Sequence, residues 1–211
     1  MAEFNKGFLG EFIGKLGTAV GSSWRGKPYM KSLPAKTKKK RKPTPKQEAA
    51  RAKFTMARRF VQPIAPLLEL TFTDTASVAT GANHATSQVI TEAITGVYPA
   101  LSIDYSLVKI FRGSFPPAEN AVATITGGKL HFTWLPNADT GNARATDKAV
   151  LVAYCPAKQR WLYLTTGFDR SAGAGNIDIS AFSGDVHSWI AFVNEDGTRA
   201  SNSVYTGKAT L

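Results

Sequence analysis

The chain has 211 residues, of which 43% are hydrophobic and 19% are charged, so it can bury a sizeable globular core. Its one cysteine, Cys155, excludes an intramolecular disulfide framework and any metal site built from several cysteines. The net charge of +11 favours a polyanionic partner, which would be nucleic acid, an anionic membrane or an acidic protein.

The excess positive charge lies in the first 60 residues, which carry +13, whereas residues 61–211 carry −2. Its centre is the run 36–42, in which six of the seven residues are basic. Pro34, Pro43 and Pro45, which flank this run, oppose helix formation, and the like charges repel one another. We therefore expect residues 1–43 to form a glycine-rich, basic, extended N-terminal arm. Such a run is typical of a nucleic-acid-binding arm or of a nuclear-import or heparin-type patch, and the alternative is a solvated tail that aids solubility.

The glycines between residues 7 and 21 recur every three or four positions, which allows two interpretations. On a helix they would form one stripe opposite Phe8, Phe12 and Leu16, as in a membrane-active amphipathic peptide. Each interior glycine costs a helix about 0.5–1 kcal/mol relative to alanine, which favours an extended segment that packs against another surface.

Residues 20–30 show a strand-like pattern in which aromatic and basic residues are interleaved. The basic residues in and beside this pattern are Arg25, Lys27 and Lys31. The aromatic residues Trp24 and Tyr29 either stack on unpaired bases, which is typically worth ~1–3 kcal/mol per base, or pack in a core.

Thr44, Pro45 and Gln47 predict the start of a helix, because threonine can cap it, proline suits its first position and glutamine completes a capping box. We expect the helix to continue to about residue 61 and to end before Pro63. Its predicted apolar face consists of Ala50, Phe54, Ala57 and Val61, and Phe60 and Ile64 extend it. The rest of its surface carries Lys46, Arg51, Lys53, Arg58 and Arg59. The helix either offers these cations to nucleic acid or is an ordinary basic surface helix.

Residues 44–117 are predicted to be a small α+β segment. After the basic helix, the pattern predicts a strand at residues 68–73, a second helix at 82–95 and a strand at 103–112. The adjacent prolines Pro116 and Pro117 mark the expected joint with the next domain.

Residues 118–211 are predicted to form a seven-stranded β-sandwich, which makes the expected fold class mainly β. The expected strands span residues 121–126, 129–135, 148–154, 160–165, 176–180, 186–194 and 200–205. The first two flank Gly127 and Gly128, a strong hairpin signal. The candidate core consists of Leu130, Phe132, Trp134, Val150, Val152, Tyr154, Leu162, Leu164, Ile177, Ile179, Trp189 and Phe192.

Two resemblances follow from these segments. Residues 120–206 resemble a fibronectin type III-like module in the strands at 130–134, 150–154 and 186–193 and in the Ser201-Asn-Ser motif. The whole chain resembles an uncharacterised protein family from Bacteroidota. The motifs are Gly14-Lys-Leu-Gly17, Val20-Gly21, Trp24-Arg-Gly26, Tyr29 with Ser32, Thr44 with Gln47, Arg51 with Phe54, Ile103-Asp-Tyr-Ser106 and Ser201-Asn-Ser-Val-Tyr205. The first resemblance implies a sandwich that binds proteins or glycans through its loops, and the second implies the same architecture without a known activity.

Catalytic and cofactor motifs are not found in the sequence. His84, His131 and His187 are far apart, and none has a second histidine or cysteine at metal-ligand spacing. The sequence has no G-x-S-x-G motif, phosphate-binding loop or dinucleotide fingerprint. We therefore expect no enzymatic activity, no cofactor and no metal site.

The leading hypothesis is a non-enzymatic structural or assembly protein, such as a component of a phage virion or another nucleoprotein particle. Its basic arm would bind nucleic acid without sequence specificity, and it would form a homo-oligomer or a larger assembly. The expected contact residues are Arg25, Lys27, Lys31, Lys36, Lys38, Lys39, Lys40, Arg41, Lys42, Lys46, Arg51, Lys53, Arg58 and Arg59, with Trp24 and Tyr29 as stacking residues. A coat-like role rests on analogy with other β bodies that carry basic arms.

The alternative hypothesis is a protein-interaction or adhesion module that binds through the loops at residues 136–147 and 167–176. Its arm would then contact an acidic partner, a ribosome or a membrane surface. Membrane activity of residues 7–21 is a third and weaker hypothesis. No convincing signal peptide is found, and no run approaches the ~20 apolar residues of a membrane span, so we expect a cytoplasmic protein that can become part of a virion or particle.

Overall fold

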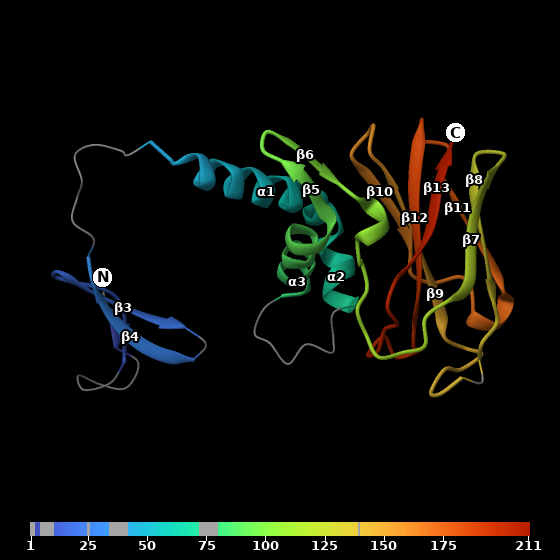
Figure 1. Ribbon diagram of the computed structural model, residues 1–211. Helices are drawn as coiled ribbons and strands as arrows, with labels where there is room; N and C mark the ends of the chain where they lie inside the picture. Colours follow the sequence, from blue (N-terminus) through green and yellow to red (C-terminus); the bar gives the residue numbers. More distant parts are fainter. Residues whose placement is uncertain (1–2, 5–10, 25, 34–41, 72–79, 139) are drawn as a thin grey trace. The chain divides into compact units, whose positions relative to one another are not determined.

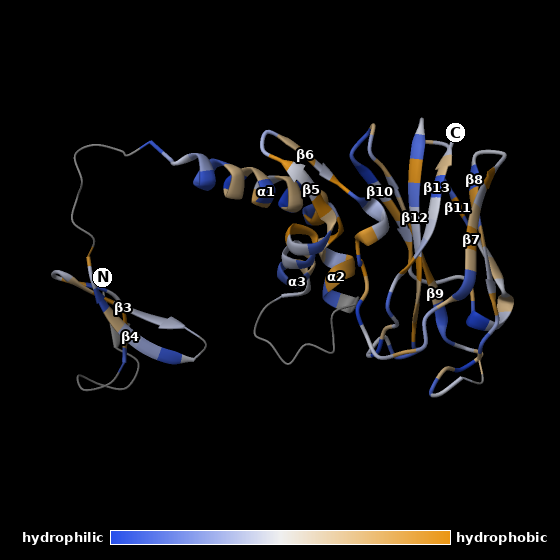
Figure 2. Cartoon of the chain, in the orientation of Figure 1, coloured by the Kyte–Doolittle hydropathy of each residue, from blue (hydrophilic) through white to orange (hydrophobic). Residues whose placement is uncertain are grey.

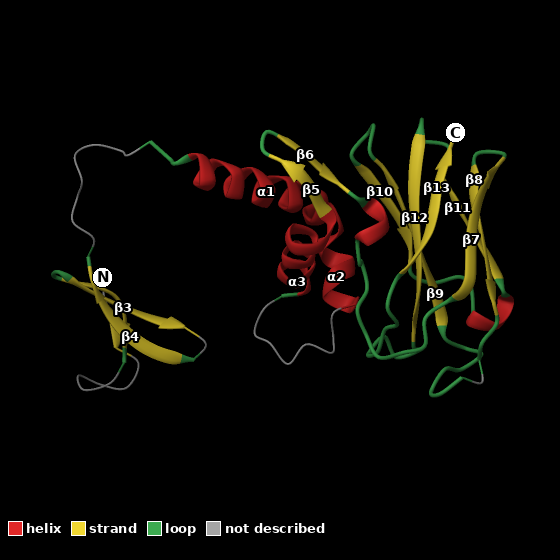
Figure 3. Ribbon diagram, in the orientation of Figure 1, coloured by secondary structure: helices red, strands yellow, loops and turns green. Residues whose placement is uncertain are grey.

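The computed structural model divides the chain into an N-terminal unit, Met1–Thr44, and a main unit, Pro45–Leu211 (Figure 1). The residues that the structure describes are 3–4, 11–24, 26–33, 42–71, 80–138 and 140–211. Of the predicted basic run, only Lys42 is among these described residues. The main unit is mainly β, with its α-helices gathered beside one of its sheets (Figure 3).

The N-terminal unit contains an antiparallel sheet with the strand order β1-β2-β3-β4. The strands are Glu3–Phe4, Phe12–Leu16, Ala19–Trp24 and Lys27–Ser32. Glycines enable the tight turns, because Gly17 and Gly26 have φ angles of +60° and +75°, where other residues are strained. The helical interpretation of the glycine-rich segment is therefore wrong for its described part, and the strand-like interpretation of residues 20–30 is confirmed for its described residues.

The first part of the main unit is helical. Its elements are α1 at Pro45–Val61, the short helical turn η1 at Gln62–Ile64, α2 at Ala65–Thr71, α3 at Gly81–Gln88 and the π-helical turn η2 at Val89–Ala93. A hairpin of β5, Ile94–Val97, and β6, Ala100–Ile103, follows, and then the 3₁₀ turn η3 at Tyr105–Leu107. The predicted helix at residues 44–61 is confirmed, and the predicted helix at 82–95 corresponds to α3 and η2.

Two predicted strands of this region are wrong. Residues 68–71 belong to α2, because the adjacent side chains of Leu67 and Leu68 are both buried, which suits one face of a helix and not the alternation of a strand. Residues 104–107 form a turn that is capped by Asp104, whose carboxylate accepts the Ser106 backbone N–H at 3.0 Å. The next residues, including the buried Ile110 and Phe111, lie in a loop.

The second part of the main unit contains two facing sheets. A sheet in the order β10-β9-β12-β13 lies opposite a sheet in the order β11-β8-β7, and a buried cluster fills the space between them. The strands are β7, Glu119–Thr126; β8, Lys129–Leu135; β9, Lys148–Cys155; β10, Arg160–Leu164; β11, Ala174–Asp178; β12, Asp185–Val193; and β13, Val204–Thr210. All seven predicted strands overlap these strands.

The last predicted strand is displaced, because the observed β13 begins at Val204 and not near residue 200. Ala200 and Ser201 are buried and form isolated bridges with Val193 and Phe115 before the chain reaches β13. Their burial explains the strand-like pattern that the sequence shows at this position.

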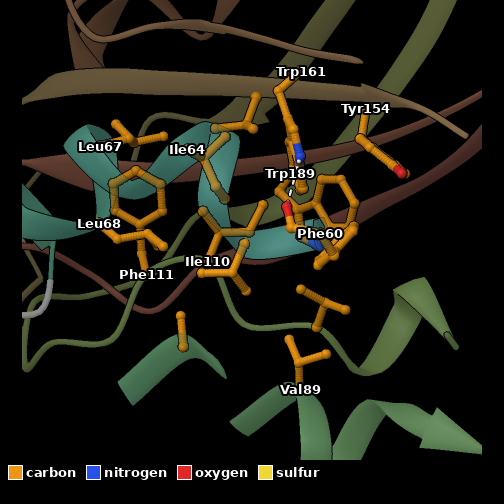
Figure 4. Close-up of a cluster of buried hydrophobic side chains, with 14 of the residues drawn as sticks. Phe60, Ile64, Leu67, Leu68, Val89, Ile110, Phe111, Tyr154, Trp161 and Trp189 are labelled. Atoms are coloured by element: carbon orange, nitrogen blue, oxygen red, sulfur yellow. Dashed lines mark hydrogen bonds between the residues drawn. The ribbon is translucent and has the colours of Figure 1, made fainter. Parts of the chain in front are cut away.

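The central strands β9 and β12 are covered on both faces. Along β9, Leu151 and Ala153 face the cluster between the sheets, whereas Val150, Val152 and Tyr154 face a second cluster beneath the helices. Figure 4 shows this second cluster, in which Phe60 lies beside Trp161 and Trp189, and Leu67 and Leu68 lie beside Phe111. Figure 2 shows apolar residues both in the helices and in the central strands. Ten of the twelve predicted core residues are buried, and Leu162 and Leu164 are partly buried.

A buried ion pair lies beside the sheets and was not predicted. The Nε of Arg170 donates to Asp147 Oδ2 at 3.2 Å, and the side chains are 0% and 1% exposed. The two Nη groups donate to Asn137 Oδ1 at 2.7 Å and to the Pro116 carbonyl at 3.1 Å. The guanidinium also lies 3.8 Å from the centre of the Phe192 ring. These contacts connect the chain before β7 to the loops around Asp147 and Arg170.

Burial of Tyr154 predicts a loss of stability at high pH. The side chain is 6% exposed, and its burial raises the pKa of the phenol from 10.0 to about 12. Between these values the unfolded chain releases the proton while the folded chain keeps it, so the stability that is present below pH 10 is lost as the pH rises towards 12. The full loss, reached above pH 12, is about 2–3 kcal/mol for this side chain, and about half of it falls between pH 9 and pH 11. Urea unfolding at pH 9 and pH 11 is expected to show a smaller loss for Tyr154→Phe than for the wild type, and equal losses would contradict the assignment.

Candidate nucleic-acid interface

The N-terminal sheet places basic and aromatic side chains on the same face. Trp24 lies opposite Lys27, Val20 lies opposite both Lys31 and Lys15, and Ser22 lies opposite Tyr29. Residues that lie directly opposite each other in antiparallel strands point to the same side of the sheet, and residues two apart along a strand do so as well. Lys15, Trp24, Lys27, Tyr29 and Lys31 therefore share one face, which we call the lysine–aromatic face.

Contacts across β3 and β4 support this arrangement. The Lys31 Nζ lies 5.7 Å from the centre of the Tyr29 ring. A hydrogen bond with Ser22 and the nearby charge of Lys31 lower the pKa of the Tyr29 phenol. Trp24, Lys27 and Tyr29 line a hollow of about 420 Å³. The side chains of Trp24 and Tyr29 are 64% and 45% exposed, so both rings are accessible in the N-terminal unit.

Helix α1 carries the second group of predicted contact residues. Its buried side consists of Ala57, Phe60 and Val61, which dock on the core beneath the helices. The predicted apolar face is wrong at Ala50 and Phe54, because Ala50 is exposed and Phe54 is 55% exposed. The cause is the direction of docking, which buries the last two turns of the helix and leaves the first turns in solvent.

The predicted cations of α1 lie on different sides of the helix. Lys46, Arg51 and Arg59 are exposed, and Lys53 and Arg58 are partly exposed. Arg51 and Arg59 line one groove, whereas Arg58 lines a different hollow together with Phe54. In the N-terminal unit, Lys27, Lys31 and Lys42 are exposed. The remaining predicted contact residues, Arg25, Lys36, Lys38, Lys39, Lys40 and Arg41, lie outside the described residues.

Two of the polar residues singled out in the sequence, His187 and Cys155, have hydrogen-bond partners. The Nδ1 of His187 lies 2.8 Å from the Tyr205 hydroxyl, and burial lowers the pKa of the imidazole. The buried Cys155 thiol donates to the Ser183 carbonyl at 3.3 Å. In the part of the chain that the structure describes, no group of three His, Cys, Asp or Glu side chains is arranged to hold a metal ion. No described helix combines the length and hydropathy of a membrane span.

Sequence reasoning did not anticipate two elements of the site region. The first is the pairing of β3 with β4, which assembles the lysine–aromatic face. The Trp24-Arg-Gly-Lys27 turn indicates this pairing if the segments on both sides of it are taken as strands. The second is the contribution of Tyr105 and Tyr154, which lie beside the exposed arginines of α1 in one groove. Their positions depend on tertiary packing, and no local pattern indicates them.

The fold defines a mainly β protein with a basic helix on its body and a basic sheet in a separate N-terminal unit. The family of unknown function DUF6266 matches residues 11–207, so the chain belongs to this family. A search of curated proteins gives no match. Among solved structures, the chain is similar to the solution structure of the fn3 domain of the human collagen alpha-1(XX) chain. The sequence identity is 13% and the TM-score is 0.33, and the similarity covers 47% of this chain and 90% of that one.

Proposed function

We propose that this chain is a non-enzymatic structural or assembly protein that binds nucleic acid without sequence specificity through its N-terminal unit. The observation that supports the proposal best is the lysine–aromatic face, where three lysines surround two exposed aromatic rings. Lysines neutralise phosphates, and exposed rings stack on unpaired bases of any sequence. The predicted basic run, residues 36–42, adds six positive charges to the same unit.

The proposed role of the main unit is assembly. The strand orders β11-β8-β7 and β10-β9-β12-β13 fit a fibronectin type III-like sandwich, which we propose as the finer description of the body. Such a body would form a homo-oligomer or a larger particle and leave the basic unit to contact the enclosed nucleic acid. We also propose that the protein is a component of a virion and that its family comes from Bacteroidota.

The binding test compares the two faces of the N-terminal sheet. Binding of a labelled single-stranded oligonucleotide by the full chain is expected to weaken at least about 5- to 150-fold in Trp24→Ala/Tyr29→Ala, the equivalent of ~1–3 kcal/mol for one stacked base. Met30→Ala is the matched control, because Met30 is 65% exposed and lies opposite Gly21 on the other face. Fluorescence anisotropy at several salt concentrations measures both affinity and salt slope.

The salt slope separates stacking from charge contacts. Lys27→Gln/Lys31→Gln is expected to reduce the steepness of the salt dependence by about 0.7 for each phosphate contact that is lost on a single strand. The stacking variant should keep the wild-type slope. Equal affinity and slope in the wild type and both double variants would refute the proposed interface.

A second candidate function is a protein-interaction module that uses loops of the β body. The structure brings residues 142–147 beside residues 194–199, where side chains of both charge signs line a hollow of about 370 Å³. Only the first of the two predicted loops contributes to this hollow. Deletion of residues 1–43 separates the two functions, because it removes the N-terminal interface and should strongly weaken nucleic-acid binding under the first proposal, whereas it should leave partner binding intact under the second.

A further inference from the structure

A groove crosses the main unit beside α1. One wall is formed by Arg51, Thr55 and Arg59. The opposite wall includes Ser102 from β6, Tyr105 from η3 and Gln159 from the β9–β10 turn, and the groove has a volume of about 720 Å³. Figure 1 shows the β5–β6 hairpin next to α1, with β10 beyond it. The groove therefore has walls from three separate segments of one compact unit.

The helical wall of the groove is cationic. Arg51, Thr55 and Arg59 are four residues apart, so they point to the same side of α1 over two turns, or about 12 Å. The residues that line the groove include no aspartate or glutamate. Neither arginine takes part in the ion pairs found among the described residues. Arg51 and Arg59 are both exposed and line the groove, and no carboxylate lines it with them. A guanidinium matches the geometry of a phosphate.

The groove wall around Tyr105 is aromatic. The Tyr105 ring lies 5.5 Å from the Tyr154 ring and 5.8 Å from the Phe60 ring, measured between centres. The centre of the His187 ring lies 4.2 Å from the centre of the Tyr105 ring. In Figure 4 the Tyr154 hydroxyl points away from Trp161. Burial raises the pKa of both phenols, so each hydroxyl is neutral at physiological pH and can donate or accept a hydrogen bond.

We propose that this groove binds a short single-stranded segment of nucleic acid, with phosphates on Arg51 and Arg59 and a base against Tyr105. This inference rests on the proposed function and adds a second contact site and a preference for unpaired nucleotides. A duplex keeps its bases stacked inside, so its bases cannot reach an aromatic ring in the wall of a groove. The two arginines suit the phosphates of a nucleic-acid strand, and the aromatic surface suits a base. The neutral hydroxyls can form hydrogen bonds with the same nucleotide.

The test measures the affinity of the full chain for a labelled oligothymidylate of ten nucleotides and, in parallel, for a duplex of ten base pairs. Arg51→Gln/Arg59→Gln is expected to weaken single-strand binding at least about tenfold, because hydrogen bonds between charged groups are worth ~1.5–3 kcal/mol each. The matched control Lys53→Gln/Arg58→Gln removes the same charge from α1 outside this groove, and its effect should be clearly smaller. Duplex binding should respond to the two variants equally.

A cross-link locates the base directly. An oligothymidylate that carries 4-thiothymidine is irradiated with the wild-type chain, and mass spectrometry of the digest is expected to find the adduct on Tyr105. Free inorganic phosphate at millimolar concentration should not abolish this adduct, because phosphate alone does not replace the stacked base.

The outcomes separate this inference from the proposed function. If both α1 variants bind the single strand equally while Trp24→Ala/Tyr29→Ala binds weakly, the groove assignment is wrong and the N-terminal interface stands. If the wild type binds no oligonucleotide at low salt but binds a polyglutamate peptide through Arg51 and Arg59, the groove takes acidic peptides and the inference is overturned. If only the groove variant loses binding, the groove is retained and the N-terminal interface is refuted.

Discussion

Asp147→Ala is expected to lower the free energy of unfolding of the main unit by about 3–5 kcal/mol, because it leaves a buried guanidinium without its carboxylate. Arg170 is 0% exposed and cannot turn towards solvent without opening the contact with Phe192. The Asp147 carboxylate also accepts the Arg144 backbone N–H at 2.9 Å, and that donor loses its partner as well. Urea unfolding followed by far-UV circular dichroism measures the change.

The control for this variant is an ion pair at the surface. The Lys208 Nζ lies 3.1 Å from Asp185, and the two side chains are 54% and 46% exposed. Solvent screens such a pair, so Lys208→Ala should leave the unfolding midpoint close to that of the wild type. If the unfolding midpoint of Asp147→Ala is as close to the wild-type midpoint as that of Lys208→Ala, another group neutralises the charge of Arg170.

A double variant distinguishes loss of the charge pair from loss of packing. Asp147→Leu/Arg170→Met removes both charges and retains apolar volume, so much of the stability lost in Asp147→Ala should return. The hydrogen bonds from Arg170 to Asn137 and to the Pro116 carbonyl are absent in this variant, which keeps the recovery incomplete. A double variant less stable than Asp147→Ala would point to those hydrogen bonds as the main contribution.

The strands of the β body could be predicted because their signals are local. Gly127 and Gly128 have φ angles of +58° and +74°, which the turn between β7 and β8 requires, and apolar residues alternate along β8. A further local signal lies in the sequence of β9. β9 reads Lys-Ala-Val-Leu-Val-Ala-Tyr-Cys and is buried from its second residue to its end, and such an unbroken apolar run is typical of a strand that is covered on both faces.

The features that could not be predicted depend on contacts between distant segments. The faces of α1 and α2 that are buried are those that pack on the outer face of the β10-β9-β12-β13 sheet. Trp161 and Trp189 lie on this face of the sheet. The partner of Arg170 is Asp147, and the sequence contains 11 other aspartates and glutamates beyond residue 60 that satisfy the same chemistry. The candidate site was predicted as a set of charges, whereas the pairing of β3 with β4 determines which of these charges surround Trp24 and Tyr29.

Phe60→Ala is expected to destabilise the main unit by about 3–5 kcal/mol, the usual cost of removing a buried phenylalanine side chain. Phe60 is 4% exposed and joins α1 to the sheet, because its ring lies 4.8 Å from Trp161 and 5.0 Å from Tyr154 between centres. Its carbonyl also accepts the Trp161 indole N–H at 3.0 Å, which is drawn as a dashed line in Figure 4. Phe54→Ala is the control on the same helix, because Phe54 is 55% exposed and should contribute little.

The way in which Phe60→Ala unfolds shows whether the helices and the sheets form one cooperative unit. Helix content followed at 222 nm and tryptophan fluorescence should report the same urea midpoint in the wild type, because Trp161 and Trp189 belong to the cluster that the helices cover. In Phe60→Ala both midpoints should fall together, because Phe60 connects α1 to Tyr154 and Trp161 of the sheet. If the helical signal alone moved to lower urea, α1 would be a detachable layer. Arg51 and Arg59 would then not be held in place beside Tyr105.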